Sequence, residues 1–217
     1  WVSYMEKGIL IIPSQKSGFE YLTNNPYSNL NISDQSIGSL LVDKENVLWV
    51  GTNGSGLYRL TFNGDRYVSK DKFLPEENVI TCLYQDSEDN IYIGTYLHGF
   101  YLYNPQNGTL KNFNKSNDHT SVNCNHVTGF AEDKEGNIWI STNGGGVNKM
   151  ERKNKNFTYN RQSTQNRNDG LLSDWCNTIF VDSDNILWVG TYVGFCCMDL
   201  NTYKKKSYTK DDKLIMN

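Results

Sequence analysis

The sequence predicts an all-β fold, namely a β-propeller fragment of four-stranded blades with about four and three-quarter blades in the chain. Three observations lead to this prediction. One apolar pattern recurs along the chain, each copy divides into four short segments separated by turn residues, and no segment keeps helical periodicity over the ~11 residues that a helix needs. Units of ~40 to 50 residues with a repeated Trp and Gly signature are typical of propeller blades. A β-sandwich is the competing architecture, but it does not require one pattern repeated in sequence order.

The repeated pattern starts with an acidic turn and continues into an apolar run centred on an aromatic residue. Its four full copies are DKENVLWVGTNGSGLYRL from Asp43, DSEDNIYIGTYLHGFYLY from Asp86, DKEGNIWISTNGGGVNKM from Asp133 and DSDNILWVGTYVGFCCM from Asp182. The first residues, WVSYMEKGILII, match the same pattern from Trp1 onward. The chain is therefore expected to begin within a repeat.

Each unit is expected to hold four antiparallel strands. An apolar first strand, such as IGSLLV from Ile37, leads through an Asp/Glu/Gly/Asn turn into the aromatic second strand, and this turn chemistry favours a hairpin. A turn ending in glycine leads to the third strand, and a polar turn leads to the fourth. We expect a single propeller region, cut from a longer repeat array, with a partial blade over 1–28 and blades over about 35–72, 78–115, 125–162 and 175–211.

The composition excludes several classes of function. With 37% hydrophobic residues, 13% aromatic residues and a mean hydropathy of −0.62, the chain can bury a core and is neither disordered nor membrane-spanning. A net charge of −3 lacks the positive field that a phosphate backbone requires, so we expect this region to contact neither nucleic acid nor a membrane. The five cysteines have no paired CxxC spacing and are interpreted as mainly buried thiols, without a disulfide framework or a zinc site.

Four segments carry a resemblance to a known family. LWVGTNGSGL (Leu48 to Leu57), IYIGTYLHGF (Ile91 to Phe100), IWISTNGGGV (Ile138 to Val147) and LWVGTYVGF (Leu187 to Phe195), each behind an Asp-led turn, resemble the two-component regulator propeller repeat. The resemblance covers essentially the whole chain. The departures are Ser3 and Ser141 where Gly is usual, Tyr92 in place of Trp, and a fourth copy that is one residue shorter before Gly194.

The resemblance implies a sensor region rather than an enzyme. In that family the repeats form the periplasmic sensor of hybrid histidine kinases, anchored in the inner membrane, and are followed by an immunoglobulin-like connector, a membrane helix, kinase and receiver domains, and a DNA-binding module. It implies an oligosaccharide or other small ligand, a homodimer in the full-length protein, and signalling through a rearrangement of propellers. No cofactor and no metal are expected, because the three histidines, His98, His119 and His126, show no metal-ligand spacing.

The repeated residues themselves are interpreted as structural. A tryptophan at one fixed position in each unit indicates packing between blades rather than a sugar-stacking platform, and the glycine that follows it allows close backbone approach. The turns DKEGN and DSEDN faintly resemble a calcium loop, but Ile138 stands where an EF-hand needs glycine, so a plain hairpin turn is favoured. No catalytic residue is predicted; for the alternative of a propeller lyase related to the streptogramin lyases, His98 is the candidate. A protein-interaction scaffold is a further alternative.

A ligand site is predicted from strand direction. If the first strand of a blade runs from one edge to the other, the second returns, so the loops between second and third strands lie beside the connectors between blades. These loops and connectors vary from copy to copy and carry aromatic rings and amides, which suit stacking on a sugar and hydrogen bonding to its hydroxyls. The predicted ligand-binding residues are Tyr4, Asn53, Tyr96, His98, Asn143, Trp175 and Tyr192.

Overall fold

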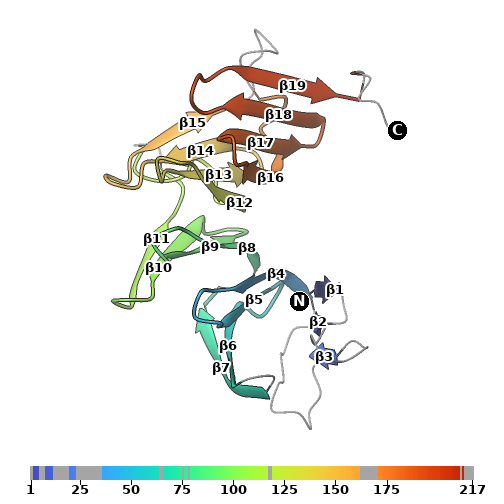
Figure 1. The fold of residues 1–217 in the computed structure, drawn as a ribbon, viewed down its shortest axis with the longest axis vertical. Coiled ribbons are helices and arrows are strands. Elements are labelled where there is room, and N and C mark those ends of the chain that lie inside the picture. The colour runs from blue at the N-terminus through green and yellow to red at the C-terminus, as the bar shows by residue number, and fades with distance from the viewer. Residues whose placement is uncertain are drawn as a thin grey trace. The chain divides into compact units, whose positions relative to one another are not determined.

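The regular structure of the described residues consists of β-strands (Figure 1). The computed structural model describes residues 36–63, 66–74, 76–77, 79–116, 119–161, 171–210 and 212. For residues 2–4, 8–11, 20–22, 62–63 and 66–70 it describes the backbone and not the side chains. In these ranges no helix is long and apolar enough to cross a membrane. The predicted all-β class is confirmed.

The strands form one three-stranded sheet and four four-stranded antiparallel sheets, and strands adjacent in sequence are hydrogen-bonded neighbours in every sheet. The three-stranded sheet consists of β1 (Val2–Tyr4), β2 (Gly8–Ile11) and β3 (Glu20–Leu22). The others are β4 (Ile37–Val42), β5 (Leu48–Thr52), β6 (Leu57–Asn63) and β7 (Arg66–Leu74); β8 (Ile80–Gln85), β9 (Ile91–Thr95), β10 (Phe100–Asn104) and β11 (Thr109–Phe113); β12 (Val127–Glu132), β13 (Ile138–Thr142), β14 (Gly146–Met150) and β15 (Phe157–Asn160); and β16 (Cys176–Val181), β17 (Ile186–Thr191), β18 (Gly194–Asp199) and β19 (Lys205–Thr209). This meander order is that of propeller blades, as predicted.

The chain divides into two compact units, each with its own core. Unit 1 contains Trp1–Tyr96 and Tyr103–Thr109, and unit 2 contains Leu97–Leu102 and Leu110–Asn217. In unit 1 the Trp49 ring lies 5.0 Å from the Phe73 ring and 5.9 Å from the Tyr103 ring. In unit 2 a single buried cluster joins residues of the β12–β15 sheet to residues of the β16–β19 sheet: Ala131, Trp139, Val147, Cys176, Ile179, Leu187, Val189, Met198 and Leu200.

A β-bulge occurs at the same place in all four full repeats, where the first strand pairs with the second. The register shifts lie between residues Ile37 and Ser39, Ile80 and Cys82, Val127 and Gly129, and Cys176 and Thr178. A bulge adds one unpaired residue and increases the local twist, so each sheet receives the same bend at the start of its first strand. The apolar pattern alone gave no sign of this irregularity, because a bulge changes backbone pairing and not composition.

The repeated acidic turn is a hairpin closed by its aspartate. Asp43 Oδ1 accepts hydrogen bonds from the backbone N–H groups of Glu45 and Val47, at 3.0 and 2.9 Å. One residue of the turn takes the left-handed conformation, with φ of 60° at Asn46. Asn and Asp tolerate this conformation better than most residues and Gly adopts it freely, which explains the residues found at the equivalent turn positions, Asp89, Gly136 and Asn185.

The same aspartate also binds the aromatic residue six positions later. Asp43 Oδ2 accepts a hydrogen bond from the Trp49 indole nitrogen at 2.8 Å, and both residues are buried. The equivalent pairs are Tyr92 hydroxyl to Asp86 at 3.1 Å, Trp139 to Asp133 at 2.9 Å and Trp188 to Asp182 at 2.7 Å. These rings are therefore structural, as the sequence indicated, and the turn carboxylates are engaged by backbone and ring donors.

Close contact between neighbouring sheets explains a repeated glycine. A Cβ atom added to Gly51 in β5 would lie 2.6 Å from the Ile80 side chain at the start of β8, in the next sheet of unit 1. A side chain at this position would therefore push the two sheets apart. This finding confirms the interpretation of the glycine as a site of close approach.

Candidate functional site

The loops between second and third strands do lie against the connectors that lead into the next sheet. In unit 1 an isolated bridge pairs Asn53 with Val79, and in unit 2 an equivalent bridge pairs Asn143 with Trp175. The backbone N–H of Asn143 also donates to the His126 carbonyl at 2.9 Å. The predicted edge of loops and connectors therefore exists in both units.

In unit 1 two of the three predicted residues meet the same connector: Asn53 forms the bridge to Val79, and the Tyr96 backbone N–H donates to the Val79 carbonyl at 3.3 Å. Asn53 is exposed and Tyr96 is 47% exposed. Tyr4 is the last residue of β1 and pairs with Gly8, so it is a strand residue and not the loop residue that we predicted; its side chain lies outside the described residues. The reason is the alignment itself, because counting from Trp1 places Tyr4 at the position of Thr52, which ends β5.

In unit 2 the structure brings Trp175 and Tyr192 together. Their ring centroids are 6.2 Å apart at an interplanar angle of 75°, although the side chains are 55% and 67% exposed. The cause is strand register, because Cys176 pairs with Thr191 and so the residue before β16 lies opposite the residue after β17. The result is an exposed aromatic pair that can contact the apolar face of a ligand from two directions.

Asn143 adds an amide beside this pair. Its backbone is held by the bridge to Trp175, and its carbonyl accepts a weak hydrogen bond from the Cys124 thiol at 3.3 Å. Asn143 Oδ1 is buried and has no hydrogen-bond partner among the described residues. The structure therefore places Asn143, Trp175 and Tyr192 in one continuous stretch of the edge, and His98 is exposed in the loop before β10.

An ion pair that the sequence did not reveal holds this stretch together. Arg161 donates to Asp174 Oδ2 from Nε at 3.0 Å and from Nη2 at 2.7 Å, and Nη2 also reaches the Gly144 carbonyl at 3.3 Å. The Asp174 carbonyl accepts the N–H groups of Gly144 and Gly146, at 3.0 and 2.9 Å. Hydrogen bonding to Asp174 raises the pKa of Arg161 above its ordinary value, so the guanidinium stays protonated. The two residues are 13 positions apart, and no sequence pattern marks them as partners.

A histidine in the described part of the edge also has a shifted pKa. Burial lowers the pKa of His126, whose ring is therefore neutral at physiological pH. Among the described residues no group of three or more His, Cys, Asp and Glu side chains is arranged to hold a metal ion. The arrangement in unit 2 brings together two aromatic rings, one amide and an ion pair.

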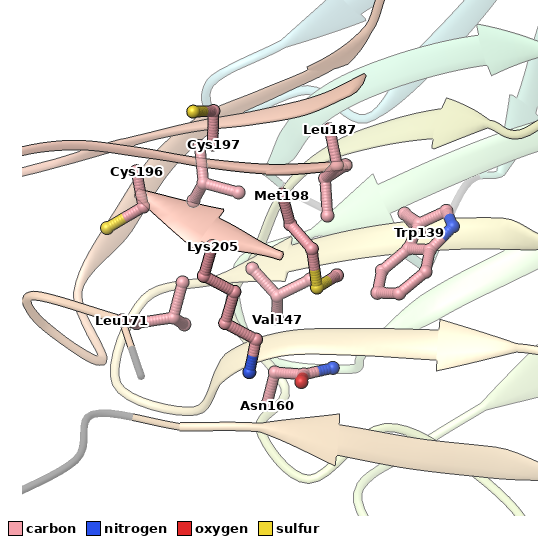
Figure 2. A pocket seen from close by; sticks show the side chains of 10 residues that line it. Trp139, Val147, Asn160, Leu171, Leu187, Cys196, Cys197, Met198 and Lys205 are labelled. Atoms are coloured by element: carbon pink, nitrogen blue, oxygen red, sulfur yellow. The ribbon is translucent and has the colours of Figure 1, made fainter. Parts of the chain in front are cut away.

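An apolar hollow lies elsewhere in unit 2, between the β12–β15 and β16–β19 sheets (Figure 2). It encloses about 370 Å³ of empty space, part of which is open solvent, and Asn160 and Lys205 are the polar members of its lining. Figure 2 shows Trp139, Val147 and Met198 pointing toward one another, and all three belong to the buried cluster of unit 2. No predicted site residue lines this hollow, so we interpret it as packing space between sheets and not as the ligand site.

Comparison with known proteins agrees with this geometry. The model of the two component regulator propeller family matches residues 31–54, 74–97, 121–144 and 170–193, which contain the four acidic turns and second strands. A histidine kinase from Formosa agariphila is 27% identical over 96% of this chain, and the chain spans 16% of that protein's length.

Among solved structures, the extracellular domain of a B. thetaiotaomicron signalling system superimposes with a TM-score of 0.72 at 17% identity, covering 94% of this chain and 29% of that one. Virginiamycin B lyase from Staphylococcus aureus superimposes with a TM-score of 0.60 at 12% identity, covering 82% of this chain and 56% of that one. At these identities the structural likeness establishes the propeller fold and not an activity.

Proposed function

Because this chain belongs to the two-component regulator propeller family, we propose that it is the ligand-sensing region of a hybrid two-component regulator and that it recognises an oligosaccharide. In this proposal the region does not catalyse a reaction. It signals to a histidine kinase elsewhere in the full-length protein, which is anchored in the inner membrane with the propeller in the periplasm. The similarity to a histidine kinase, 27% identical over 96% of this chain, supports this assignment.

The observation that carries the ligand proposal is the exposed Trp175–Tyr192 pair beside Asn143. An exposed aromatic pair next to a buried acceptor without a partner is costly to maintain unless a ligand or water uses it. Rings stack on the C–H faces of sugars and amides bond their hydroxyls, so the site suits an oligosaccharide. A ligand of this kind signals by binding one arrangement of a dimer more tightly than another, since only differential affinity shifts an equilibrium.

The alternatives have weaker support. The likeness to virginiamycin B lyase is a likeness of fold, and the described part of the edge offers no clustered acid, base or metal ligands for a lyase. An interaction scaffold would use a broad apolar surface, whereas the edge in unit 2 mixes aromatic, amide and charged groups.

The test is calorimetric titration of the propeller region with a panel of oligosaccharides from plant, host and microbial polysaccharides. We expect at least one to bind, and Trp175→Ala to weaken that binding by about tenfold or more, equivalent to at least ~1.4 kcal/mol. Tyr203→Asn is the matched control, because Tyr203 is 57% exposed but lies in the β18–β19 turn, at the other end of the sheet from Tyr192. Equal loss of affinity in both variants, or turnover of the bound sugar, would contradict the proposal.

A further inference from the structure

The connector before β12 and strand β14 carry buried polar atoms that have no hydrogen-bond partner among the described residues. Asn123 donates its backbone N–H to Asn148 Oδ1 at 2.9 Å and its Nδ2 to the Gly145 carbonyl at 2.8 Å. These two bonds fix the orientation of both amides, because turning either amide over would place two donors or two acceptors against each other. Asn123 Oδ1 and Asn148 Nδ2 are then left buried without a hydrogen-bond partner in the described part of the chain.

A third group of the same kind stands two residues before Asn123 in the same connector. Ser121 is 5% exposed and its Oγ is buried with no partner among the described residues, while its carbonyl accepts the Tyr159 hydroxyl at 2.9 Å. Tyr159 pairs in register with Asn148, which is fully buried, so Ser121 is connected to Asn148 through one hydrogen bond and one strand pairing. We call Ser121, Asn123 and Asn148 the polar notch.

The chemistry of the polar notch defines what can fill it. One atom requires a donor, one requires an acceptor, and the serine hydroxyl can serve as either. A buried polar group left unmatched costs about 1–3 kcal/mol, so the Asn123 oxygen and the Asn148 nitrogen, on two residues joined by a hydrogen bond, favour an occupant that both donates and accepts. Water and an alcohol hydroxyl meet this requirement. A carboxylate does not, because its oxygens are acceptors and would face the Asn123 oxygen, which is also an acceptor.

The polar notch adjoins the candidate site through the β13–β14 loop. A Cβ atom added to Gly145 would lie 2.2 Å from Asn123 Oδ1 and 2.6 Å from Cys124 Cβ, so the connector presses directly on this loop. On its other side the same loop is held by Asp174, the residue before Trp175. The polar notch and the aromatic pair therefore flank one loop.

We propose that the polar notch is a hydroxyl-binding subsite of the candidate site, occupied by water in the free protein and by a hydroxyl of an uncharged sugar in the complex. This inference rests on the proposed oligosaccharide recognition and adds Asn123 and Asn148 to the residues that determine specificity. It selects neutral sugars over uronates, because the polar notch contains no cation and its unmatched carbonyl repels a carboxylate. A hydroxyl that replaces the water must reproduce the hydrogen bonds that the water makes.

The first experiment is titration of the propeller region with neutral hexasaccharides of glucose, xylose, mannose and galactose and with hexagalacturonate. We expect a neutral sugar to bind more tightly than the uronate, and Asn123→Ala to weaken the neutral complex by about tenfold. Asn137→Ala is the matched control, since Asn137 belongs to the same sheet but its amide is satisfied by Asp133 in the acidic turn. This control variant should keep the wild-type affinity.

The outcomes separate the two proposals. A sugar complex that is lost with Trp175→Ala but unchanged with Asn123→Ala, or a preference for the uronate, overturns the polar notch and leaves the proposed function standing. Absence of binding by every oligosaccharide of the panel overturns both.

A second measurement does not depend on any ligand or on the folding of a variant. A high-resolution crystal structure of the free wild-type region should show a water within hydrogen-bonding distance of Asn123 Oδ1 and Asn148 Nδ2. A dry polar notch in that structure would overturn the inference.

Discussion

The aspartate at the head of each full repeat accepts hydrogen bonds from at least three donors. In the β12–β15 sheet Asp133 Oδ1 accepts the N–H groups of Glu135 and Asn137 at 3.0 and 2.8 Å, and Asp133 Oδ2 accepts the Trp139 indole at 2.9 Å. The turn and the core ring thus share one carboxylate. This arrangement explains why aspartate and a ring with a polar donor recur together, and why tyrosine can replace tryptophan at position 92.

Removing a single ring donor should have a measurable cost. Tyr92→Phe deletes only the hydroxyl that donates to Asp86, on a ring that is fully buried. We expect the free energy of unfolding in urea to fall by about 1–3 kcal/mol, because the buried Asp86 carboxylate loses one of its hydrogen-bond donors. Tyr203→Phe, on an exposed ring, is the control and should leave the unfolding midpoint unchanged; an unchanged midpoint in Tyr92→Phe would show that water replaces the hydroxyl.

The carboxylate of the last repeat predicts an acid-dependent loss of stability. Two hydrogen bonds hold the pKa of Asp182 below its ordinary value of 3.8. The larger effect comes from the Trp188 indole N–H, and the second from the backbone N–H of Ile186. A depressed folded-state pKa means that the stabilisation is complete above the unfolded-state pKa and is lost as the pH falls through the folded-state value. Urea unfolding between about pH 2 and 6 should therefore show a steeper acid decline for wild type than for Asp182→Asn. Parallel pH profiles of the two proteins would contradict this expectation.

At the scale of structural elements, the candidate site depends on hydrogen bonds between connectors and loops. The β13–β14 loop is hydrogen-bonded to Asn123 and to Asp174. Both residues belong to connectors, which lie outside the repeat pattern. Their residues vary because nothing in the packing of the sheets requires one particular sequence there.

The Arg161–Asp174 pair should position the site without adding much stability. Both side chains are partly exposed, at 56% and 21%, so Asp174→Ala should lower the free energy of unfolding by no more than about 1 kcal/mol. The affinity for an oligosaccharide should nevertheless fall several-fold, because Arg161 no longer ties the β13–β14 loop to the connector that carries Trp175. Calorimetry and urea unfolding measure the two effects on the same variant.

The matched control for that experiment is the exposed pair of Arg59 and Asp71, which lies on β6 and β7 in unit 1. Asp71→Ala should change stability to a similar small extent and leave affinity unaltered. A loss of affinity as large as that of Asp174→Ala would show that ion pairs act here through general stability alone.

At the scale of the whole molecule, the two compact units carry their own reporters of unfolding. Burial raises the pKa of Cys82 in unit 1 and of Cys176 in unit 2 to about 12. Both thiols are therefore protonated in the native protein, where Cys176 is buried and Cys82 is half-buried.

Thiol labelling at pH 8 should accordingly be slow at these two positions in native buffer and become fast in urea. Mass-spectrometric peptide mapping measures each cysteine separately, so equal urea dependence of Cys82 and Cys176 would indicate one cooperative transition. Rapid labelling of either thiol in native buffer would show that its surroundings open without unfolding of the unit.

The sequence by itself determined the all-β repeat, the acidic hairpin turns and the structural role of the buried rings. These features depend on local turn chemistry and on a period of alternating strands, and both can be read along the chain. It also indicated the edge of loops and connectors, since strand direction follows from counting strands.

Only the tertiary structure decided which edge residues meet. The Trp175–Tyr192 contact follows from the register of β16 on β17, and the bulges at Cys176 and its equivalents cannot be recognised from composition. The Arg161–Asp174 pair joins residues 13 positions apart, and the polar notch joins the connector before β12 to β14. Backbone pairing decides the contact between Trp175 and Tyr192, because a shift of one residue between β16 and β17 would turn side chains toward the opposite face.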